Sequence, residues 1–287
     1  SLGRAGLNFL SASLDSHPQI IMMACLSFFR TINAFRFDFL KNDQNFPPNN
    51  EKKFLKQFLD YLYIAKRFNI ETQIIKNVKE KKKLYRLLVK EYDKQKKGHF
   101  YSKVFFALHF AFAKFHNKNI NKKKIIVVYE KNPMFLNNYK KYFDDPKFIM
   151  LTKNPLMNYS GNKKSSANSS KYFPSKLNFL YGQIYSGLSF INKNKTNIIR
   201  IEDLNLNFSK EIKKITKFLG ISMSSTVFKT TYLGKKWGHD SSFIVNGKKT
   251  YTTKRIDKSF NLPEYQIKRA LSIIDNKELI MVETIFN

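Results

Sequence analysis

Cysteine is nearly absent from this chain, and its scarcity excludes a protein stabilised by internal disulfide bonds. The 287 residues contain a single cysteine, Cys25, so no disulfide can form within the chain. The five histidines are scattered, and none has the spacing to a cysteine or another histidine that a zinc site requires. The sequence therefore predicts neither a disulfide framework nor a bound metal.

Long apolar runs are also missing. The two longest, residues 20–29 and 104–113, are too short to cross a bilayer. We therefore expect no membrane span in this sequence and a cytoplasmic location. The chain has no initiator Met and begins inside a motif that a strand normally precedes, so we expect a truncated N-terminus and leave open a signal or anchor upstream.

Arginine and acidic residues are scarce beside lysine. Lys and Arg total 52 against 21 Asp and Glu, a net charge of +31, yet only eight of the basic residues are arginine. Surfaces that read phosphates and base edges usually use arginine, because its guanidinium donates two parallel hydrogen bonds. The charge is therefore weak evidence for nucleic acid as a partner, and a basic nucleic-acid-binding protein is kept as the alternative function.

The chain is rich in apolar residues, which make up 43% of it and include 28 Phe, so it can bury a large core. Three short runs, residues 124–129, 147–152 and 197–202, are almost continuously apolar, a pattern typical of strands buried on both faces of a parallel sheet. Helical spacing of apolar residues between these runs predicts an α/β protein of three layers, a central parallel sheet flanked by helices. No linker divides the chain, so we expect one domain over residues 1–287.

The expected helices are defined by apolar spacing and by their ends. A first helix over residues 5–14 stops before Pro18, and a later one over 209–219 closes at Gly220. Residues 50–118 hold several amphipathic helices and are expected to form a helical insertion on the acceptor side of the domain. A further helix is expected over 173–191, after a flexible Ser, Asn and Lys-rich loop at 161–171.

The start of the chain, Gly3-Arg4-Ala5-Gly6, has the composition of a phosphate-binding loop. Two glycines flank an arginine where a helix begins, an arrangement that offers free backbone N–H groups and one cation to an anion. Nucleoside triphosphatases would have Gly-Lys-Ser/Thr next, whereas this chain has Gly6-Leu7-Asn8, which disfavours a nucleotide kinase.

This loop, followed by a helix that ends Leu-Asp-Ser-His-Pro, resembles the 5′-phosphosulfate loop of sulfotransferases that use 3′-phosphoadenosine 5′-phosphosulfate (PAPS). The resemblance implies a P-loop-like sulfotransferase fold and PAPS as co-substrate. It also implies that the cofactor is bound by Gly3, Arg4, Ala5, Gly6, Leu7 and Asn8. Leu7 and Asn8 replace the hydroxyl residues of the family, which favours binding over turnover.

Two more strand ends resemble that family. Lys131, in Tyr-Glu-Lys-Asn-Pro after the run 124–129, matches a lysine near proline that contacts the phosphosulfate, although a surface lysine before a turn is the plain alternative. Lys153 and Ser160, after the run 147–152, match the 3′-phosphate segment. Lysine stands there in place of the usual arginine, and the serine comes one residue early.

The remaining likenesses lie toward the C-terminus. The run 197–202 leads into Glu202-Asp203-Leu204 and a helix ending Phe-Leu-Gly, a marker of the fold in which we expect the two acidic residues to be structural. A loop with Lys236, Trp237 and Ser241 resembles a C-terminal cofactor loop of many members, suited to cover adenine or phosphate. Trp237 could equally anchor that loop to the core.

Together the likenesses imply transfer of a sulfuryl group from PAPS to a hydroxyl or amine of a carbohydrate or other small acceptor. Arg4 and Lys131 are the implied catalytic residues, because they would neutralise charge on the leaving oxygen. The base stays unassigned; Asp38, His109 and His116 are the nearest substitutes in the sequence, and His109 on an apolar helix is more typical of a core residue. A catalytically degenerate relative is the second alternative.

Overall fold

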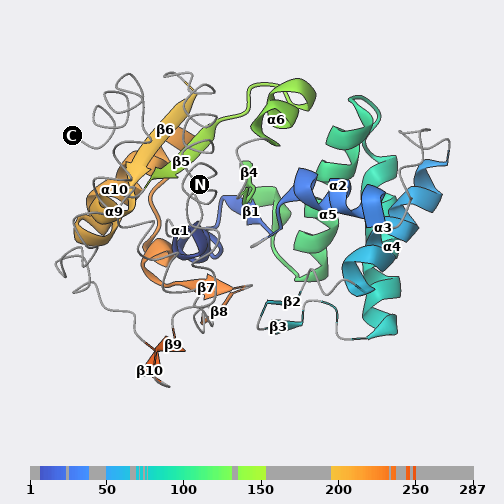
Figure 1. Cartoon of the computed structure of the whole chain (residues 1–287), viewed down its shortest axis with the longest axis horizontal. Coiled ribbons are helices and arrows are strands. Elements are labelled where there is room, and N and C mark those ends of the chain that lie inside the picture. The colour runs from blue at the N-terminus through green and yellow to red at the C-terminus, as the bar shows by residue number, and fades with distance from the viewer. Residues whose placement is uncertain are drawn as a thin grey trace, which may run out of the picture.

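The computed structural model is a mixed α/β structure (Figure 1). It describes residues 7–23, 26–38, 50–64, 69–70, 72–73, 75, 77–130, 135–152, 195–232, 234–236, 244–245 and 248–249. The helices are α1 (Leu7–Leu14), α2 (Phe28–Asp38), α3 (Glu51–Ile64), α4 (Val78–Asp93), α5 (Phe100–Phe115), α6 (Leu136–Tyr142), α9 (Ile201–Leu206) and α10 (Phe208–Leu219), with 3-10 turns η1 (Ile120–Lys122) and η4 (Ser225–Phe228). The strands are β1 (Ile20–Met22), β2 (Asn69–Ile70), β3 (Thr72–Gln73), β4 (Ile125–Val127), β5 (Phe148–Thr152), β6 (Thr196–Arg200), β7 (Thr231–Tyr232), β8 (Lys235–Lys236), β9 (Ile244–Val245) and β10 (Lys248–Lys249).

Parallel strands form the middle of the structure, in two pairs. β1 pairs with β4, with Ile20 opposite Ile125, and β5 pairs with β6, with Phe148 opposite Thr196. The strands predicted at 124–129 and 147–152 are confirmed as β4 and β5. Among the described residues the two pairs are not hydrogen-bonded to each other, so the continuous three-layer sheet stays a prediction.

The strand predicted over 197–202 needs correction at its end. β6 stops at Arg200, opposite Thr152 at the end of β5, and Ile201 begins α9 directly. Glu202 and Asp203 lie in the first turn of this helix, where negative charge interacts favourably with the helix dipole. Asp203 also lies 3.8 Å from Arg200 Nε. The acidic pair thus marks a helix start rather than the last residues of a strand.

The apolar run 20–29 was not assigned to an element from the sequence, and the structure divides it. Its first residues form β1, all three of them buried, and its last two begin α2. Ser27 precedes α2 and accepts a backbone hydrogen bond from Thr31 at 2.9 Å. One continuous apolar run therefore serves both a strand and the start of a helix, because β1 and the first two residues of α2 are all buried.

Helices α2 to α5 gather at one end of the molecule, beside β1 and β4 (Figure 1). They enclose an aromatic core in which Phe35 stacks edge-on against Phe54 and Phe58, with ring centroids 5.4 and 5.5 Å apart. The amphipathic helices predicted within 50–118 are present as α3, α4 and α5. The role of this region as an acceptor-side insertion stays a prediction, as does the single-domain organisation.

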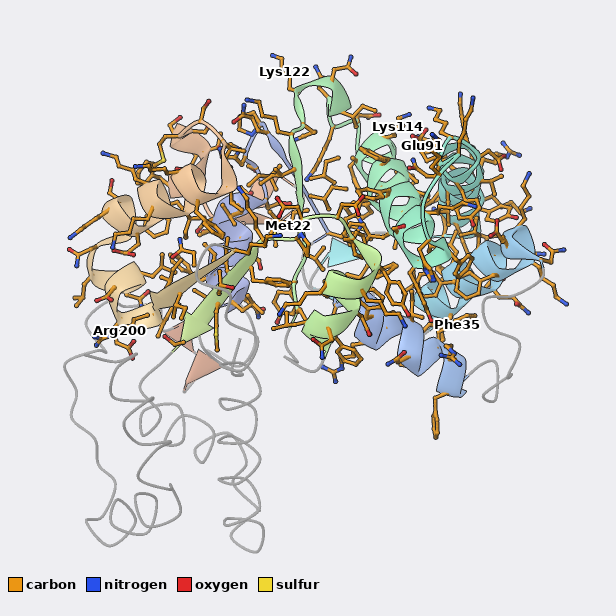
Figure 2. The ribbon with its side chains drawn as sticks, turned by 90° about the horizontal axis from the view of Figure 1, so that it is seen from above. Met22, Phe35, Glu91, Lys114, Lys122 and Arg200 are labelled. Carbon is orange, nitrogen blue, oxygen red and sulfur yellow. The ribbon has the colours of Figure 1, made fainter. Side chains whose placement is uncertain are left out.

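A buried ion pair joins α4 to α5, and Figure 2 shows Glu91 and Lys114 together between these helices. The Lys114 ammonium donates to the Glu91 carboxylate at 2.6 Å, and Lys94 donates to the same oxygen at 3.0 Å. Burial by itself would raise the pKa of Glu91, but the two lysines outweigh it and the pKa is lowered. The carboxylate therefore stays charged and cross-links the helices at neutral pH.

A second core lies at the other end, between α1, the strands, α9 and α10. α10 is strongly amphipathic: Ile212 and Ile215 are fully buried, and lysines occupy its outer face. The helix ends where the sequence predicts. Gly220 follows it as the C-cap with φ +71°, a left-handed conformation that glycine adopts without strain. The expected helix at 173–191 and loop at 161–171 lie outside the described residues.

A cavity of about 400 Å³ separates the two strand pairs. Its lining is mostly apolar and comes from β4 and β5, from α1 on one side and from α5 and α6 on the other. Both strands of the first pair border it, because Ile21 and Met22 of β1 and all three residues of β4 line the cavity. β1 is completely buried, whereas every residue of β4 is partly exposed.

The buried histidine of α5 should make stability depend on pH. His109 is 1% exposed and its Nδ1 donates to the Phe105 carbonyl at 2.8 Å; burial lowers its pKa to about 4. The unfolded chain binds a proton below about pH 6.5 while the folded chain does not, so stability is complete above that pH and falls as the pH drops toward 4.

We expect wild type to lose roughly 3 kcal/mol between pH 7 and pH 4 through this one group. The free energy of unfolding of His109→Leu, measured with urea at pH 7 and at pH 4.5, should fall less between these pH values than that of wild type. Parallel pH profiles for the two proteins would contradict the assignment.

Candidate functional site

Only part of the predicted site falls within the described residues. Leu7 and Asn8 are the first two residues of α1, and Lys236 is the last residue of β8. Outside the described residues lie Gly3, Arg4, Ala5, Gly6, Lys131, Lys153, Ser160, Trp237 and Ser241. The described part of the candidate site therefore consists of the elements that lead into and out of these positions.

α1 begins directly after the glycine-flanked arginine of the sequence. The helix was predicted from Ala5 to Leu14 and is described from Leu7 to Leu14. The first backbone N–H groups of a helix have no partner inside the helix and point along its axis toward the preceding loop. Leu10 and Leu14 bury the other side of α1 in the second core, which fixes the direction of that axis.

A hydrogen bond ties the start of α1 to the end of β4. The hydroxyl of Tyr129, which is 3% exposed, donates to Oδ1 of Asn8 at 2.8 Å. These two residues are 121 positions apart in the sequence. Their bond joins the helix that follows the glycine loop to the segment that leads into Lys131. The Asn8 side-chain oxygen therefore accepts a hydrogen bond from within the protein.

The residue after Tyr129 makes a different contact. Ser27 Oγ donates to Oε2 of Glu130 at 2.5 Å, so the carboxylate lies against the start of α2. The strand end thus carries a hydroxyl bound to α1, a carboxylate bound at α2 and, next in sequence, Lys131. Glu130 was not among the predicted site residues, although its place in the Tyr-Glu-Lys-Asn-Pro motif could have drawn attention to it.

Glu130 also influences a neighbouring phenol. Burial, reinforced by the charge of Glu130, raises the pKa of Tyr139 on α6 well above its usual value. Tyr139 is 8% exposed and belongs to the first core, where its ring packs edge-on against Phe29. This tyrosine is therefore neutral at any physiological pH and serves as a wall of the site rather than as an acid or base.

The three residues named from the sequence as stand-ins for a base are placed elsewhere. His109 is buried within α5, as its apolar helix indicated, and its low pKa leaves it neutral. His116 caps the C-terminal end of α5, and Asp38 is the last residue of α2.

The histidine of the His-Pro motif after α1 joins two segments of the fold by hydrogen bonds. His17 is completely buried; its Nδ1 accepts the backbone N–H of Gln19 at 3.1 Å, so its Nε2 carries the proton and donates to the Ser222 carbonyl at 2.9 Å. The pKa of His17 is lowered, chiefly by burial and further by Lys123, against the opposing effect of Ser222. A neutral His17 therefore joins the end of α1 to the segment after α10, and Gln19 Oε1 adds a bond from Ser222 N at 2.7 Å.

The residues that the structure describes include neither a membrane-spanning helix nor a cluster of metal ligands. In that part of the chain no helix is both long and apolar enough to cross a membrane. No three His, Cys, Asp or Glu side chains among the described residues are grouped so that they could hold a metal ion.

No family model matches the sequence, and no curated protein matches it. Among solved structures, the sulfotransferase domain from the curacin biosynthetic pathway is similar at 14% identity with a TM-score of 0.46, over 94% of this chain and 93% of that one. The sulfotransferase domain from the Synechococcus PCC 7002 olefin synthase is similar at 14% identity with a TM-score of 0.49, over 94% of this chain and 90% of that one. The structure is thus similar to sulfotransferase domains over most of its length, at low sequence identity.

The bond between Tyr129 and Asn8 can be tested by removing one hydroxyl. Tyr129→Phe leaves a buried amide oxygen without its donor, so we expect the free energy of unfolding to fall by about 1 kcal/mol or more. Tyr85→Phe is the matched control, because the Tyr85 hydroxyl makes an exposed bond of 3.4 Å to Lys52 and should cost less than about 0.5 kcal/mol. Equal losses in urea unfolding would show that the buried bond contributes nothing special.

Proposed function

We propose that this protein is a PAPS-dependent sulfotransferase that transfers a sulfuryl group to a hydroxyl or amine of a carbohydrate or other small molecule. One observation carries the proposal: the Tyr129 to Asn8 bond joins the first turn of α1 to the end of β4. We infer that Arg4, before this helix, and Lys131, after this strand, approach the same end of α1. Two cations and a helix N-terminus brought together there would suit a phosphosulfate group.

The proposed roles divide along the nucleotide. Backbone N–H groups of residues 5–8 would bind the 5′-phosphosulfate, with Arg4 and Lys131 compensating the charge that develops on the leaving oxygen. Lys153 and Ser160, which follow β5, would bind the 3′-phosphate. Lys236, Trp237 and Ser241 would bind the phosphate or adenine from the C-terminal side.

The reaction forms one bond and breaks one. The acceptor oxygen or nitrogen attacks sulfur, the bond between sulfur and the 5′-phosphate oxygen breaks, and 3′,5′-bisphosphoadenosine leaves with that electron pair. The acceptor must lose its proton, and we propose that Glu130, the carboxylate that follows Tyr129 beyond the end of β4, accepts it. Its contact with Ser27 directs it toward α2, and this supports an acceptor that enters from the side of the helical block.

Calorimetry with 3′,5′-bisphosphoadenosine tests the binding site. We expect wild type to bind it, Arg4→Ala to weaken binding about 10- to 100-fold and Lys153→Ala about 10-fold, because each removes a charge-assisted hydrogen bond. Arg86→Ala and Lys82→Ala are matched controls: both side chains are exposed on α4 and should leave affinity within about twofold.

Failure of wild type to bind would overturn the proposal. So would tight binding to DNA that is steeply salt-dependent and unchanged by Arg4→Ala, the behaviour of a protein that uses its lysines collectively.

Transfer itself is tested with labelled PAPS and a panel of carbohydrate and small hydroxylated acceptors. Glu130→Gln should keep nucleotide affinity within a few fold while transfer falls at least 100-fold, in line with the effect of a general base. Ser27→Ala is the comparison: it removes the hydrogen bond that directs the carboxylate but keeps its charge, so transfer should fall by a much smaller factor than in Glu130→Gln. Full activity of Glu130→Gln would exclude Glu130 as the base, and nucleotide binding by wild type without transfer to any acceptor would indicate a degenerate relative.

A further inference from the structure

A buried carboxylate lies where helix geometry does not favour one. Asp15 follows α1 directly, and its side chain is 0% exposed. The C-terminal end of a helix carries a partial negative charge, so a carboxylate there is repelled, and burying it adds a cost of desolvation. Such a residue requires strong compensating partners.

Those partners come from distant parts of the chain. Lys118, just beyond α5, lies 3.3 Å from Oδ1 of Asp15. Oδ2 accepts two hydrogen bonds, one from the Thr231 hydroxyl at 3.1 Å and one from the backbone N–H of Gly234 at 2.9 Å. Ser16 Oγ lies 2.5 Å from Thr231 Oγ1 and completes the network. Asp15 therefore joins α1 to the end of α5 and to a segment more than 200 residues away.

The distant segment is a short hairpin. β7 and β8 are antiparallel, with Thr231 opposite Lys236 and Tyr232 opposite Lys235. Gly234, in the turn between them, has φ +76°, which glycine adopts without strain. The same carboxylate oxygen thus holds both the first residue of the hairpin and its turn, and Figure 1 shows β7 and β8 beside α1.

We propose that Asp15 is a positioning residue for the nucleotide site: it fixes the hairpin against α1 and thereby sets the position of Lys236, the register partner of Thr231. This inference rests on the proposed function, in which Lys236 binds the nucleotide and α1 presents the phosphate loop. The lengths are compatible with this role: α1 spans about 12 Å, and the two residues after Gly234 span up to about 7 Å, more than half the length of the helix.

The plain structural alternative is that the network only holds the fold together. The two differ in whether the anchor acts through Lys236. A staple would lower thermal stability and leave nucleotide affinity unchanged, or would change it by the same factor whether Lys236 is present or not. A positioning residue would lose its effect on affinity once the side chain it positions is removed.

A double-mutant cycle distinguishes them. Thr231→Val keeps the shape of the side chain and removes the hydroxyl that donates to Asp15. We expect it to weaken binding of 3′,5′-bisphosphoadenosine about 5- to 10-fold in the wild-type background and less than about twofold in the Lys236→Met background. Ser16→Ala, which removes a second-tier contact of Thr231, should act in the same direction by a smaller factor and provides a variant with less effect on folding.

Thr226→Val is the matched control. Its hydroxyl lies 2.9 Å from that of Ser224, the residue before η4, so affinity should stay within about twofold in both backgrounds. Equal weakening by Thr231→Val in both backgrounds, or a lower thermal midpoint with unchanged affinity, would overturn the inference while leaving the proposed function intact. Absence of binding by wild type would instead overturn the proposed function and this inference with it.

Discussion

Helix α1 has eight residues, and a helix of that length does not hold its conformation in water without tertiary contacts. Everything proposed for the site depends on this helix, so its anchors matter more than its propensity. Tyr129 binds its first turn, while Asp15 and His17 attach its end to the segments that follow α5 and α10. The position of the loop before Leu7 relative to β4 follows from these few hydrogen bonds.

The scarce acidic residues make several of the internal connections of this very basic protein. Asp15, Glu91 and Glu211 have side chains that are 8% exposed or less, and each is paired with a lysine. A buried carboxylate that loses its lysine, or a lysine that loses its carboxylate, leaves an uncompensated charge, so these pairs are costly to break. The lysine excess therefore has a structural as well as a surface component, and this weakens the case that net charge alone describes the protein's partner.

The apolar cavity between β4 and β5 shapes the centre of the molecule. Strand pairs of this kind are marginal alone, and here each is supported by helices: α1 and α5 contact β1, and α9 and α10 contact β6. Because β4 borders the cavity on one side and β1 on the other, its end, with Tyr129 and Glu130, lies at the junction of the two cores. Tyr129 faces α1 and Glu130 faces α2 because successive side chains of an extended segment alternate in direction.

The sequence by itself determined the features that depend on local pattern. The continuous apolar runs of β4 and β5, the amphipathic period of α10 and its stop at Gly220 all rest on residues within a few positions of one another. Only the tertiary structure decided how the run 20–29 is divided between β1 and α2, why β6 ends at Arg200, and which groups Asn8 and Asp15 bind. These features depend on partners from about 50 to more than 200 residues away in the sequence. Packing of the two cores brings such partners together, and it leaves no periodic signal in the sequence.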